Sequence, residues 1–278
     1  MKYKVINDTI EVYSKEEFNP QHILECGQVF CFHKEGEKYL LYPQNQYAEI
    51  WEESEKYVIS TKNPQYFVKY LALDQNYQQI KEELSKFEIM QNPLKFGYGI
   101  RILKQNLFET LISFIISANN NIKRITLILN NLRRELGEKN GEIYSFPSHD
   151  ALKNCDKEFF KRMGAGYRAD YLVKVCKQIT PEILQEYDKL PTTQLRNKLI
   201  ELAGVGPKVA DCVLLFGYNR GDVFPVDTWI EKMYNQYFPI ECNREKIRNN
   251  LVAMFGKLSG QAQQYLFYYQ RSGEWQKR

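Results

Sequence analysis

The segment best suited to chemistry is a glycine-rich connection within residues 192–218. Apolar residues at helical spacing precede it, and Gly204 and Gly206 permit a tight turn and close backbone approach to a ligand. Pro207 suits the first position of the following helix. We therefore predict a helix–hairpin–helix over about 192–218, whose outward backbone N–H groups would suit a phosphate. A purely structural helical hairpin is the simpler alternative.

Lys208 stands at the start of the second helix, in a stretch rich in apolar residues. A helix N-terminus disfavours a cation, and apolar surroundings disfavour the charged form of an amine. A neutral amine is a nucleophile. Taken by itself, Lys208 is better explained as a solvated lysine that attracts a phosphate, so the residues leave both roles open.

Asp227 follows Lys208 by 19 residues and ends an apolar connector that includes Pro225. Asp is a favoured N-cap, so the simple interpretation is a cap on the next helix. A carboxylate held rigidly at a helix start is also suited to stabilising a developing positive charge. The two interpretations are compatible.

Composition limits the classes of function. The chain has 278 residues, a formal net charge of +4 and 14% aromatic residues. This charge is too small to indicate a polyanion partner unless basic residues concentrate on one face. Six cysteines lack C-x-x-C spacing, and three histidines lack H-x-E or H-x3-H spacing, so we expect no metal site.

The N-terminus lacks the apolar core of a signal peptide, and no run of 18 apolar residues occurs. We therefore expect a protein of the cytoplasm or nucleoid, or of the nucleus if the source is eukaryotic, with no membrane contact.

The elements that must position these residues fall into two classes. Residues 1–63 contain short runs of β-branched and aromatic residues separated by turn signals, as in an antiparallel sheet. The predicted strands are 3–6, 9–13, 29–32, 39–42, 47–51 and 57–60, with one helical turn near 20–24. From residue 64 the apolar period becomes helical, and after residue 99 the chain is predicted almost wholly as helices. The fold class is α+β, with an N-terminal antiparallel-sheet domain over 1–92 and a larger all-helical body over 93–278.

The hairpin, Lys208 and the Pro225-Val226-Asp227 segment together resemble the helix-hairpin-helix (HhH-GPD) DNA glycosylase superfamily, in particular its bifunctional 8-oxoguanine branch in a bacterial or archaeal form. Further matching segments occur in the same order along the chain. They are Gly27-Gln28-Val29-Phe30, the stretch 117–125, Gly166-Tyr167-Arg168-Ala169 and the stretch 260–267. The resemblance therefore covers most of the chain.

The resemblance implies a glycosylase/AP lyase that flips 8-oxoguanine out of duplex DNA, opposite cytosine, and removes it. Lys208 would attack C1′ and form a Schiff base, β-elimination would then cleave the strand, and Asp227 would stabilise the developing positive charge. The lysine makes a cofactor unnecessary, although the family allows a structural monovalent cation in the hairpin. We expect a monomer whose partner is double-stranded DNA.

The resemblance also assigns the contacts of the damaged base. The Gly27 carbonyl would accept the N7–H that distinguishes 8-oxoguanine from guanine. Cys212 and Phe267 would sandwich the ring, and Gln263 would bind its pairing edge. In simpler terms, Cys212 is a small core residue and Gln263 a solvated helix position.

The remaining assignments concern the duplex. Asn119 would fill the gap in the base stack, Tyr167 would wedge beside it, and Arg124 and Arg168 would read the orphaned cytosine. Hairpin N–H groups at Gly204, Gly206 and Val209 would bind phosphates. One departure from the family pattern is Trp229, which stands where a phosphate-binding His is expected.

Two other functions compete with this one. The chain could be an HhH glycosylase for another oxidised or alkylated base. It could also be a DNA-binding protein without catalytic activity that uses only the hairpin.

Overall fold

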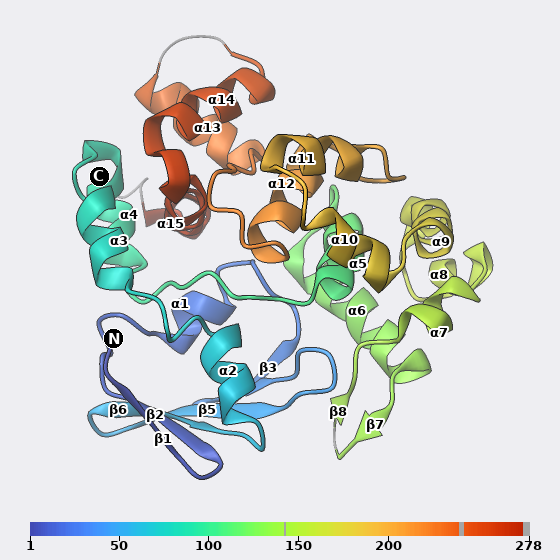
Figure 1. Cartoon of the computed structure of the whole chain (residues 1–278), viewed down its shortest axis with the longest axis horizontal. Coiled ribbons are helices and arrows are strands. Elements are labelled where there is room, and N and C mark those ends of the chain that lie inside the picture. Colours follow the sequence, from blue (N-terminus) through green and yellow to red (C-terminus); the bar gives the residue numbers. More distant parts are fainter. Residues whose placement is uncertain (142, 239–241, 275–278) are drawn as a thin grey trace.

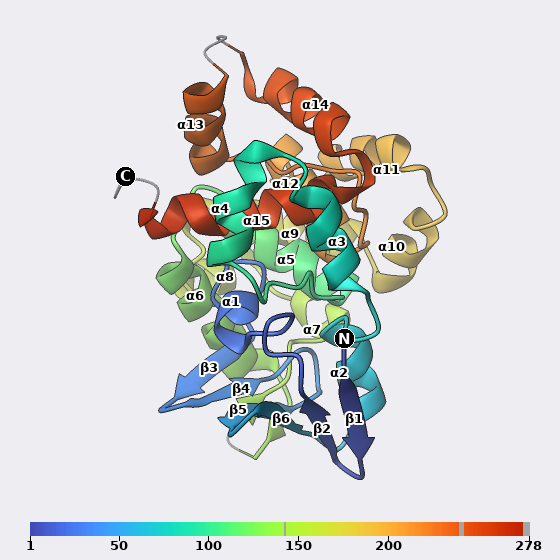
Figure 2. The same cartoon turned by 90° about the vertical axis from the view of Figure 1, so that its left-hand side faces the viewer.

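The computed structural model describes residues 1–141, 143–238 and 242–274. A sheet occupies one end of the molecule and helices form the rest (Figures 1 and 2). The strands are β1 (Tyr3–Ile6), β2 (Thr9–Val12), β3 (Phe32–Glu35), β4 (Lys38–Leu41), β5 (Ala48–Glu53), β6 (Lys56–Ser60), β7 (Lys139–Asn140) and β8 (Ile143–Tyr144). The predicted α+β class is confirmed.

The N-terminal sheet is antiparallel and six-stranded within the described part of the chain, in the order β1-β2-β6-β5-β4-β3. Its hairpins close on tight turns that need a left-handed residue, such as Asn7 at φ 50° and Ser54 at φ 51°. Its alternating apolar residues, including Ile10, Leu41 and Ile59, are fully buried.

One strand prediction was wrong. The run 29–32 contributes only Phe32 to β3, and the strand continues through polar residues to Glu35. Gly36, at φ 57°, supports a two-residue turn that pairs Glu35 with Lys38, so the hairpin lies further along the chain than its apolar pattern suggests. The displaced residues form a buried loop, in which the Phe30 ring meets Phe114 of the helical body at 5.9 Å.

One helix stands at the predicted turn near 20–24, and helices make up most of the chain after residue 64, as predicted. They are α1 (Pro20–Leu24), α2 (Pro64–Tyr70), α3 (Tyr77–Leu84), α4 (Gln91–Phe96), α5 (Leu107–Ser117), α6 (Ile122–Leu136), α7 (His149–Lys153), α8 (Lys157–Arg162), α9 (Ala169–Gln178), α10 (Pro181–Tyr187), α11 (Thr192–Ile200), α12 (Pro207–Phe216), α13 (Thr228–Tyr237), α14 (Arg244–Phe255) and α15 (Ser259–Ser272), with single 3₁₀ turns η1 (Glu88–Met90), η2 (Gly166–Arg168) and η3 (Gly256–Leu258). The helix–hairpin–helix is therefore α11 and α12. Gly137 and Gly141 in the sequence predict a loop between them, whereas the structure has strand β7 there, paired with β8.

Side chains at the helix starts explain many of these boundaries. A side-chain oxygen accepts a backbone N–H of the first turn in most of these helices, which satisfies a group that has no partner inside the helix. The capping residues are Asn19, Asn63, Asn76, Asn106, Asn121, Ser148, Asp156, Thr180, Asp227 and Asn243.

The interior consists of three apolar clusters. One lies beneath the sheet, one joins α5, α6, α9, α11 and α12, and one joins α3, α4, α13, α14 and α15. The third includes Leu84, Ile89 and Met90, which therefore pack with the C-terminal helices. The division of the chain at residue 92 stays a prediction.

A buried ion cluster holds the second helix of the hairpin against its neighbours. The Asp211 carboxylate, whose side chain is 2% exposed, accepts from Arg196 Nε of α11 at 3.0 Å and from Arg248 Nε of α14 at 2.8 Å. Arg196 also pairs with Glu245 at 2.9 Å. Burial raises the pKa of Asp211, whereas the two guanidinium groups oppose that rise. The cluster thus joins three helices through one carboxylate.

Replacing Asp211 by Asn should lower the free energy of unfolding by about 3 kcal/mol, because the buried carboxylate that two part-buried guanidinium groups share loses its charge and Arg248 loses its ionic partner. Denaturant titration would measure this change. The matched control is Glu245→Gln on the exposed side of the cluster, where we expect a loss below about 1 kcal/mol. Equal losses in the two variants would contradict the assigned role of Asp211.

Candidate active site

The predicted catalytic residues converge on one cavity of about 580 Å³. Its walls come from the loop after α1, the junction of α5 and α6, the start of α12, the start of α13, and α15. Four predicted site residues line it: Gly27, Lys208, Asp227 and Phe267. They lie up to 240 positions apart in the sequence, so tertiary packing alone assembles them.

Lys208 lies in the first turn of α12 and is half-buried. Its Nζ is 5.4 Å from the centre of the Phe114 ring, which forms an apolar floor beneath the amine. Cys212, one turn further along α12, is buried. Burial raises the pKa of the Cys212 thiol to about 11, and the charge and hydrogen bond of Lys208 offset part of that rise. The thiol is therefore protonated at neutral pH and adjoins the amine.

Asp227 is the N-cap of α13. Its Oδ1 accepts the backbone N–H groups of Trp229 and Ile230, both at 3.0 Å. The buried residues Phe224 and Val226 fix the chain on its approach to this cap. The cap interpretation is confirmed, and the same geometry holds a carboxylate in the wall of the cavity that Lys208 also lines. Its charge-stabilising role stays a prediction.

Gly27 faces the aromatic wall of the cavity at close range. Its φ is 89°, and a Cβ placed there would lie 3.2 Å from Phe267 Cε1 and 2.8 Å from Arg271 Nη1. Any side chain would therefore intrude between the loop and α15. The next residue, Gln28, is fully buried and bonds to the backbone of Ile23, Arg101 and Leu103, so the loop is anchored on its far side.

Gln263 lies one turn before Phe267 on α15. It is 5% exposed, and its Oε1 has no hydrogen-bond partner among the described residues. A buried amide oxygen without a partner costs free energy, which a bound ligand with a donor would recover. This observation suits the predicted base contact of Gln263, although that contact stays a prediction.

The residues assigned to the duplex gather around the carbonyl of Ala118. Tyr167, 54% exposed in η2, donates to it at 3.3 Å, and Arg168 Nε donates at 2.8 Å. Asn119 follows at φ 48° and is exposed at the tip of the α5–α6 junction. Arg124 is exposed at the start of α6, where its Nη2 donates to the Gly164 carbonyl at 3.3 Å.

Arg168 differs from the other three because it is only 3% exposed. Its guanidinium donates to the backbone carbonyls of Ala118, Asn119 and Ala165. In this state it holds the Asn119 loop in place. Its predicted contact with cytosine stays a prediction, and it would require these hydrogen bonds to be exchanged.

The two glycines of the hairpin turn have different roles, one in packing and one at the exposed start of α12. Gly204 has φ 79°, and a Cβ there would lie 2.7 Å from the Tyr171 ring. Gly206 is the N-cap of α12. A Cβ added to it would have no heavy atom within 4 Å, so the helix start is open to a ligand. Val209 is buried through its side chain and contributes only its backbone N–H to that helix start. Phosphate binding at these residues stays a prediction.

Sequence reasoning missed two parts of the cavity wall. Phe114 lies beneath Lys208, and Arg271 lies against Phe267 with its guanidinium 5.4 Å from the ring centre. The spacing of four residues from Phe267 was the available signal for Arg271. Trp229 also lines the cavity, so the residue that replaces the expected His faces the site.

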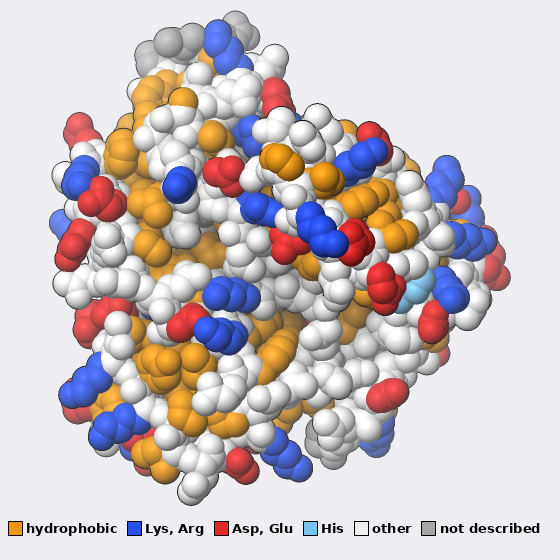
Figure 3. Space-filling view, in the orientation of Figure 1, with side chains coloured by type: hydrophobic (Ala, Val, Ile, Leu, Met, Phe, Trp, Pro, Cys, Tyr) orange, Lys and Arg blue, Asp and Glu red, His pale blue; other side chains and the backbone are white. Residues whose placement is uncertain are grey.

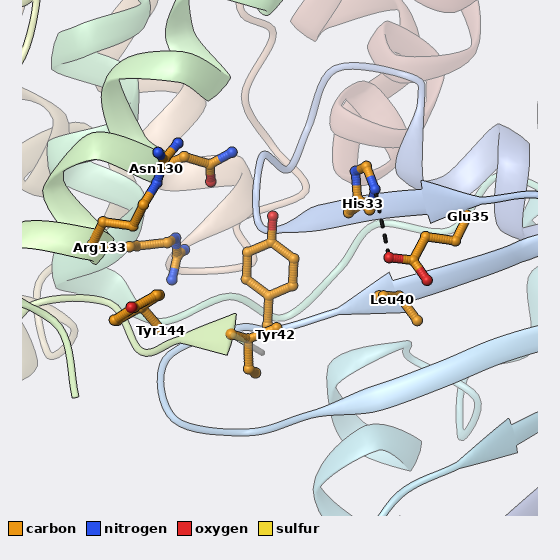
Figure 4. A pocket seen from close by; sticks show the side chains of 9 residues that line it. His33, Glu35, Leu40, Tyr42, Asn130, Arg133 and Tyr144 are labelled. Atoms are coloured by element: carbon orange, nitrogen blue, oxygen red, sulfur yellow. Dashed lines mark ion pairs between the residues drawn. The ribbon is translucent and has the colours of Figure 1, made fainter. Parts of the chain in front are cut away.

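A second hollow, of about 230 Å³, lies between the sheet edge, α6 and β8 (Figure 4). No predicted site residue lines it. His33 and Glu35 form an ion pair on one side at 3.8 Å, and the Arg133 guanidinium lies 5.3 Å from the Tyr42 ring on the other. Arg133 is paired with the buried Glu109, so its charge is already neutralised within the protein. We therefore interpret this hollow as a packing junction between the sheet and the helices.

Surface charge is mixed on the face seen in Figure 3, where Lys and Arg alternate with Asp and Glu. Within residues 1–141, 143–238 and 242–274, no group of three or more His, Cys, Asp or Glu could hold a metal ion. No helix in that described part is long and apolar enough to cross a membrane.

Two family models match the chain. Residues 11–111 match the N-terminal domain of 8-oxoguanine DNA glycosylase, and residues 112–256 match the HhH-GPD superfamily of base excision DNA repair proteins. Among curated relatives, an N-glycosylase/DNA lyase of Saccharomyces cerevisiae is 35% identical over 54% of this chain and 45% of its own length. A probable N-glycosylase/DNA lyase of Methanothermobacter thermautotrophicus is 32% identical over 62% of this chain and 64% of its own. The chain thus spans about half to two thirds of these relatives.

Among solved structures, the 8-oxoguanine glycosylase/lyase of Clostridium acetobutylicum, in complex with double-stranded DNA containing cytosine opposite 8-oxoguanine, superposes with a TM-score of 0.91. It is 36% identical, and the match covers 98% of each chain. A 3-methyladenine DNA glycosylase of Archaeoglobus fulgidus has a TM-score of 0.75 at 20% identity over 95% of this chain and 99% of its own, a likeness of fold alone.

The two hairpin glycines should respond differently to substitution. Gly204→Ala should lower the free energy of unfolding by about 2–3 kcal/mol, because it combines a left-handed φ with a clash against Tyr171. Gly206→Ala is the matched control and should cost at most about 1 kcal/mol, for a weaker cap. Thermal and denaturant unfolding would check both, and a Gly204→Ala protein as stable as the parent would refute the packing argument.

Proposed function

The chain belongs to the 8-oxoguanine DNA glycosylase/lyase family of the HhH-GPD superfamily, and from this premise we propose that it excises 8-oxoguanine opposite cytosine in duplex DNA and then cleaves the strand. The observation that carries the proposal is the convergence of Lys208, Asp227, Gly27 and Phe267 on one cavity. A nucleophile, a carboxylate, a backbone carbonyl acceptor and an aromatic platform are the groups that such a reaction needs.

Base recognition rests on the difference between the lesion and guanine. 8-Oxoguanine carries a proton on N7 and an oxygen on C8, whereas guanine has an acceptor at N7. The Gly27 carbonyl accepts the N7–H, and Phe267 stacks on the base face. Cys212 supports the other face as a neutral thiol, and the unpartnered Oε1 of Gln263 supports a contact with the pairing edge. Extrusion from the stack is required because the duplex hides the glycosidic bond.

Displacement of the base begins with the Lys208 amine. Its lone pair forms a bond to C1′ while the glycosidic bond breaks, and the base departs with that electron pair and gains a proton. Asp227 stabilises the positive charge that develops on the sugar. Opening of the sugar ring then leaves a Schiff base between Nζ and C1′. Loss of a proton from C2′ expels the 3′ phosphate and breaks the strand.

The duplex is held by the exposed groups around the cavity. Tyr167 and Asn119 enter the space left by the extruded nucleotide, and Arg124 faces the orphaned base. Backbone N–H groups at Gly204, Gly206 and Val209 bind phosphates without adding side-chain charge. This arrangement makes a modest net charge sufficient for binding.

No cofactor takes part in this scheme, because the lysine supplies the nucleophile. The proposal has three further parts. A monovalent cation binds to hairpin carbonyls, the protein is a monomer, and it is located in the cytoplasm or nucleoid, or in the nucleus if the source is eukaryotic. Each is independent of the chemistry and can be tested separately.

Borohydride trapping tests the nucleophile. The protein incubated with an 8-oxoguanine duplex and borohydride should form a covalent complex, and Lys208→Gln should abolish it and slow excision by at least about a thousandfold. Lys198→Gln, an exposed lysine on α11, is the matched control and should trap normally. Full trapping by Lys208→Gln would identify another nucleophile and overturn the assignment. Binding without any trapping by the unaltered protein would favour the noncatalytic alternative.

Excision from duplexes with different lesions tests the substrate. 8-Oxoguanine paired with each of the four bases should be released, fastest opposite cytosine, because Arg124 and Arg168 favour that base. Chromatographic detection of the released base measures excision separately from strand cleavage. Release of 3-methyladenine without release of 8-oxoguanine would replace the proposal with the other glycosylase function.

A further inference from the structure

Two side chains of α15 hold consecutive backbone carbonyls of the loop that precedes Gly27. Gln264 Nε2 donates to the Cys26 carbonyl at 2.8 Å, and Arg271 Nη2 donates to the Glu25 carbonyl. The two residues are seven apart and so share one face of the helix. Figure 2 shows α15 passing beside α1, whose C-terminal end leads into this loop.

The loop is also held on the other side of Gly27. The Gln28 carbonyl accepts Gln105 Nε2 at 2.8 Å, and the Gln28 side chain is bonded at both its nitrogen and its oxygen. The carbonyls of residues 25, 26 and 28 therefore all have donors. No residue in the described ranges donates to the carbonyl of Gly27, which leaves that single acceptor for a ligand.

Arg271 has a second nitrogen that the protein does not use. Its Nη1 is buried and has no partner among the described residues. This nitrogen lies 2.8 Å from the position a Gly27 Cβ would occupy, and the guanidinium covers the Phe267 ring at 5.4 Å. A buried cationic donor without an acceptor is costly, so a ligand that supplies an oxygen there is favoured.

We infer that Arg271 is a specificity-determining residue, which positions the Gly27 carbonyl through Nη2, with Gln264 as its partner, and presents Nη1 to an oxygen of the bound purine. This inference rests on the proposed function. An acceptor next to a donor matches the N7–H of 8-oxoguanine and its adjacent C8 oxygen. Guanine has an acceptor at N7, which repels the Gly27 carbonyl, and no oxygen at C8 to accept from Nη1. The oxygen on C6 is common to both bases, so discrimination by Arg271 requires that Nη1 donate to the C8 oxygen. Arg271 and Gln264 therefore add to discrimination without touching the reacting atoms.

The test separates base recognition from strand chemistry in the full chain. Arg271→Leu should slow single-turnover excision of 8-oxoguanine about 10- to 100-fold, while cleavage at a preformed abasic site changes less than about twofold, because that substrate has no base to recognise. Gln264→Leu should act in the same direction with a smaller loss. Arg271→Lys should restore part of the rate, since it keeps one donor and the charge.

Binding gives a second readout. In a Lys208→Gln background, where excision is too slow to consume the duplex during the measurement, the preference for an 8-oxoguanine duplex over a guanine duplex should fall about tenfold when Arg271 is replaced by Leu. Arg220→Leu is the matched control, because Arg220 also donates to backbone carbonyls and has an unpartnered nitrogen but does not line the cavity. It should leave both the preference and the excision rate unchanged.

Three results would count against these proposals. Unchanged 8-oxoguanine excision by Arg271→Leu would overturn the inference. An equal loss of excision and abasic-site cleavage would also overturn it, since Arg271 would then only support the fold. If the unaltered protein cleaves abasic sites but releases no 8-oxoguanine, the proposed function itself fails, and that outcome is visible without any variant.

Discussion

The close contact between α15 and the Gly27 loop is the constraint on which the candidate site depends. Gly27 has no side chain, and this allows the loop to approach Phe267 and Arg271 closely. The side chains of Gln264 and Arg271 then hold the backbone carbonyls of the two residues before Gly27. This contact joins the N-terminal part of the chain to its C-terminal helix. Residues of both parts line the cavity.

Polar anchors outside the cavity hold the two proposed reacting groups, Lys208 and Asp227, in place. Lys208 is carried by α12, which the Asp211 cluster ties to α11 and α14. Asp227 is fixed by the two N–H groups of the helix that it caps. A nucleophile and a carboxylate that are held rigidly speed a reaction more than the same groups on mobile side chains, because the correct orientation is then already fixed.

A net charge of only +4 is compatible with the proposed binding of DNA. Charges of both signs mix on the face seen in Figure 3, so long-range attraction from that face is weak. Backbone N–H groups at an open helix start bind phosphate without adding to the count of basic residues. Tyr167, 54% exposed beside the Asn119 loop, is proposed to add a flat surface on which a base stacks, a contact that needs no side-chain charge.

Local residue chemistry was enough to predict the sheet, the hairpin helices, the Asp227 cap and the family resemblance, because turns, caps and apolar periods depend on near neighbours in the chain. It misplaced the 29–32 strand, since a tight turn at Gly36 and burial against Phe114 outweighed β propensity. It also missed Phe114 and Arg271 as cavity residues, and it could not foresee that Arg168 is buried against backbone carbonyls. Those facts depend on contacts between residues from 50 to 244 positions apart, which only the packed structure decides.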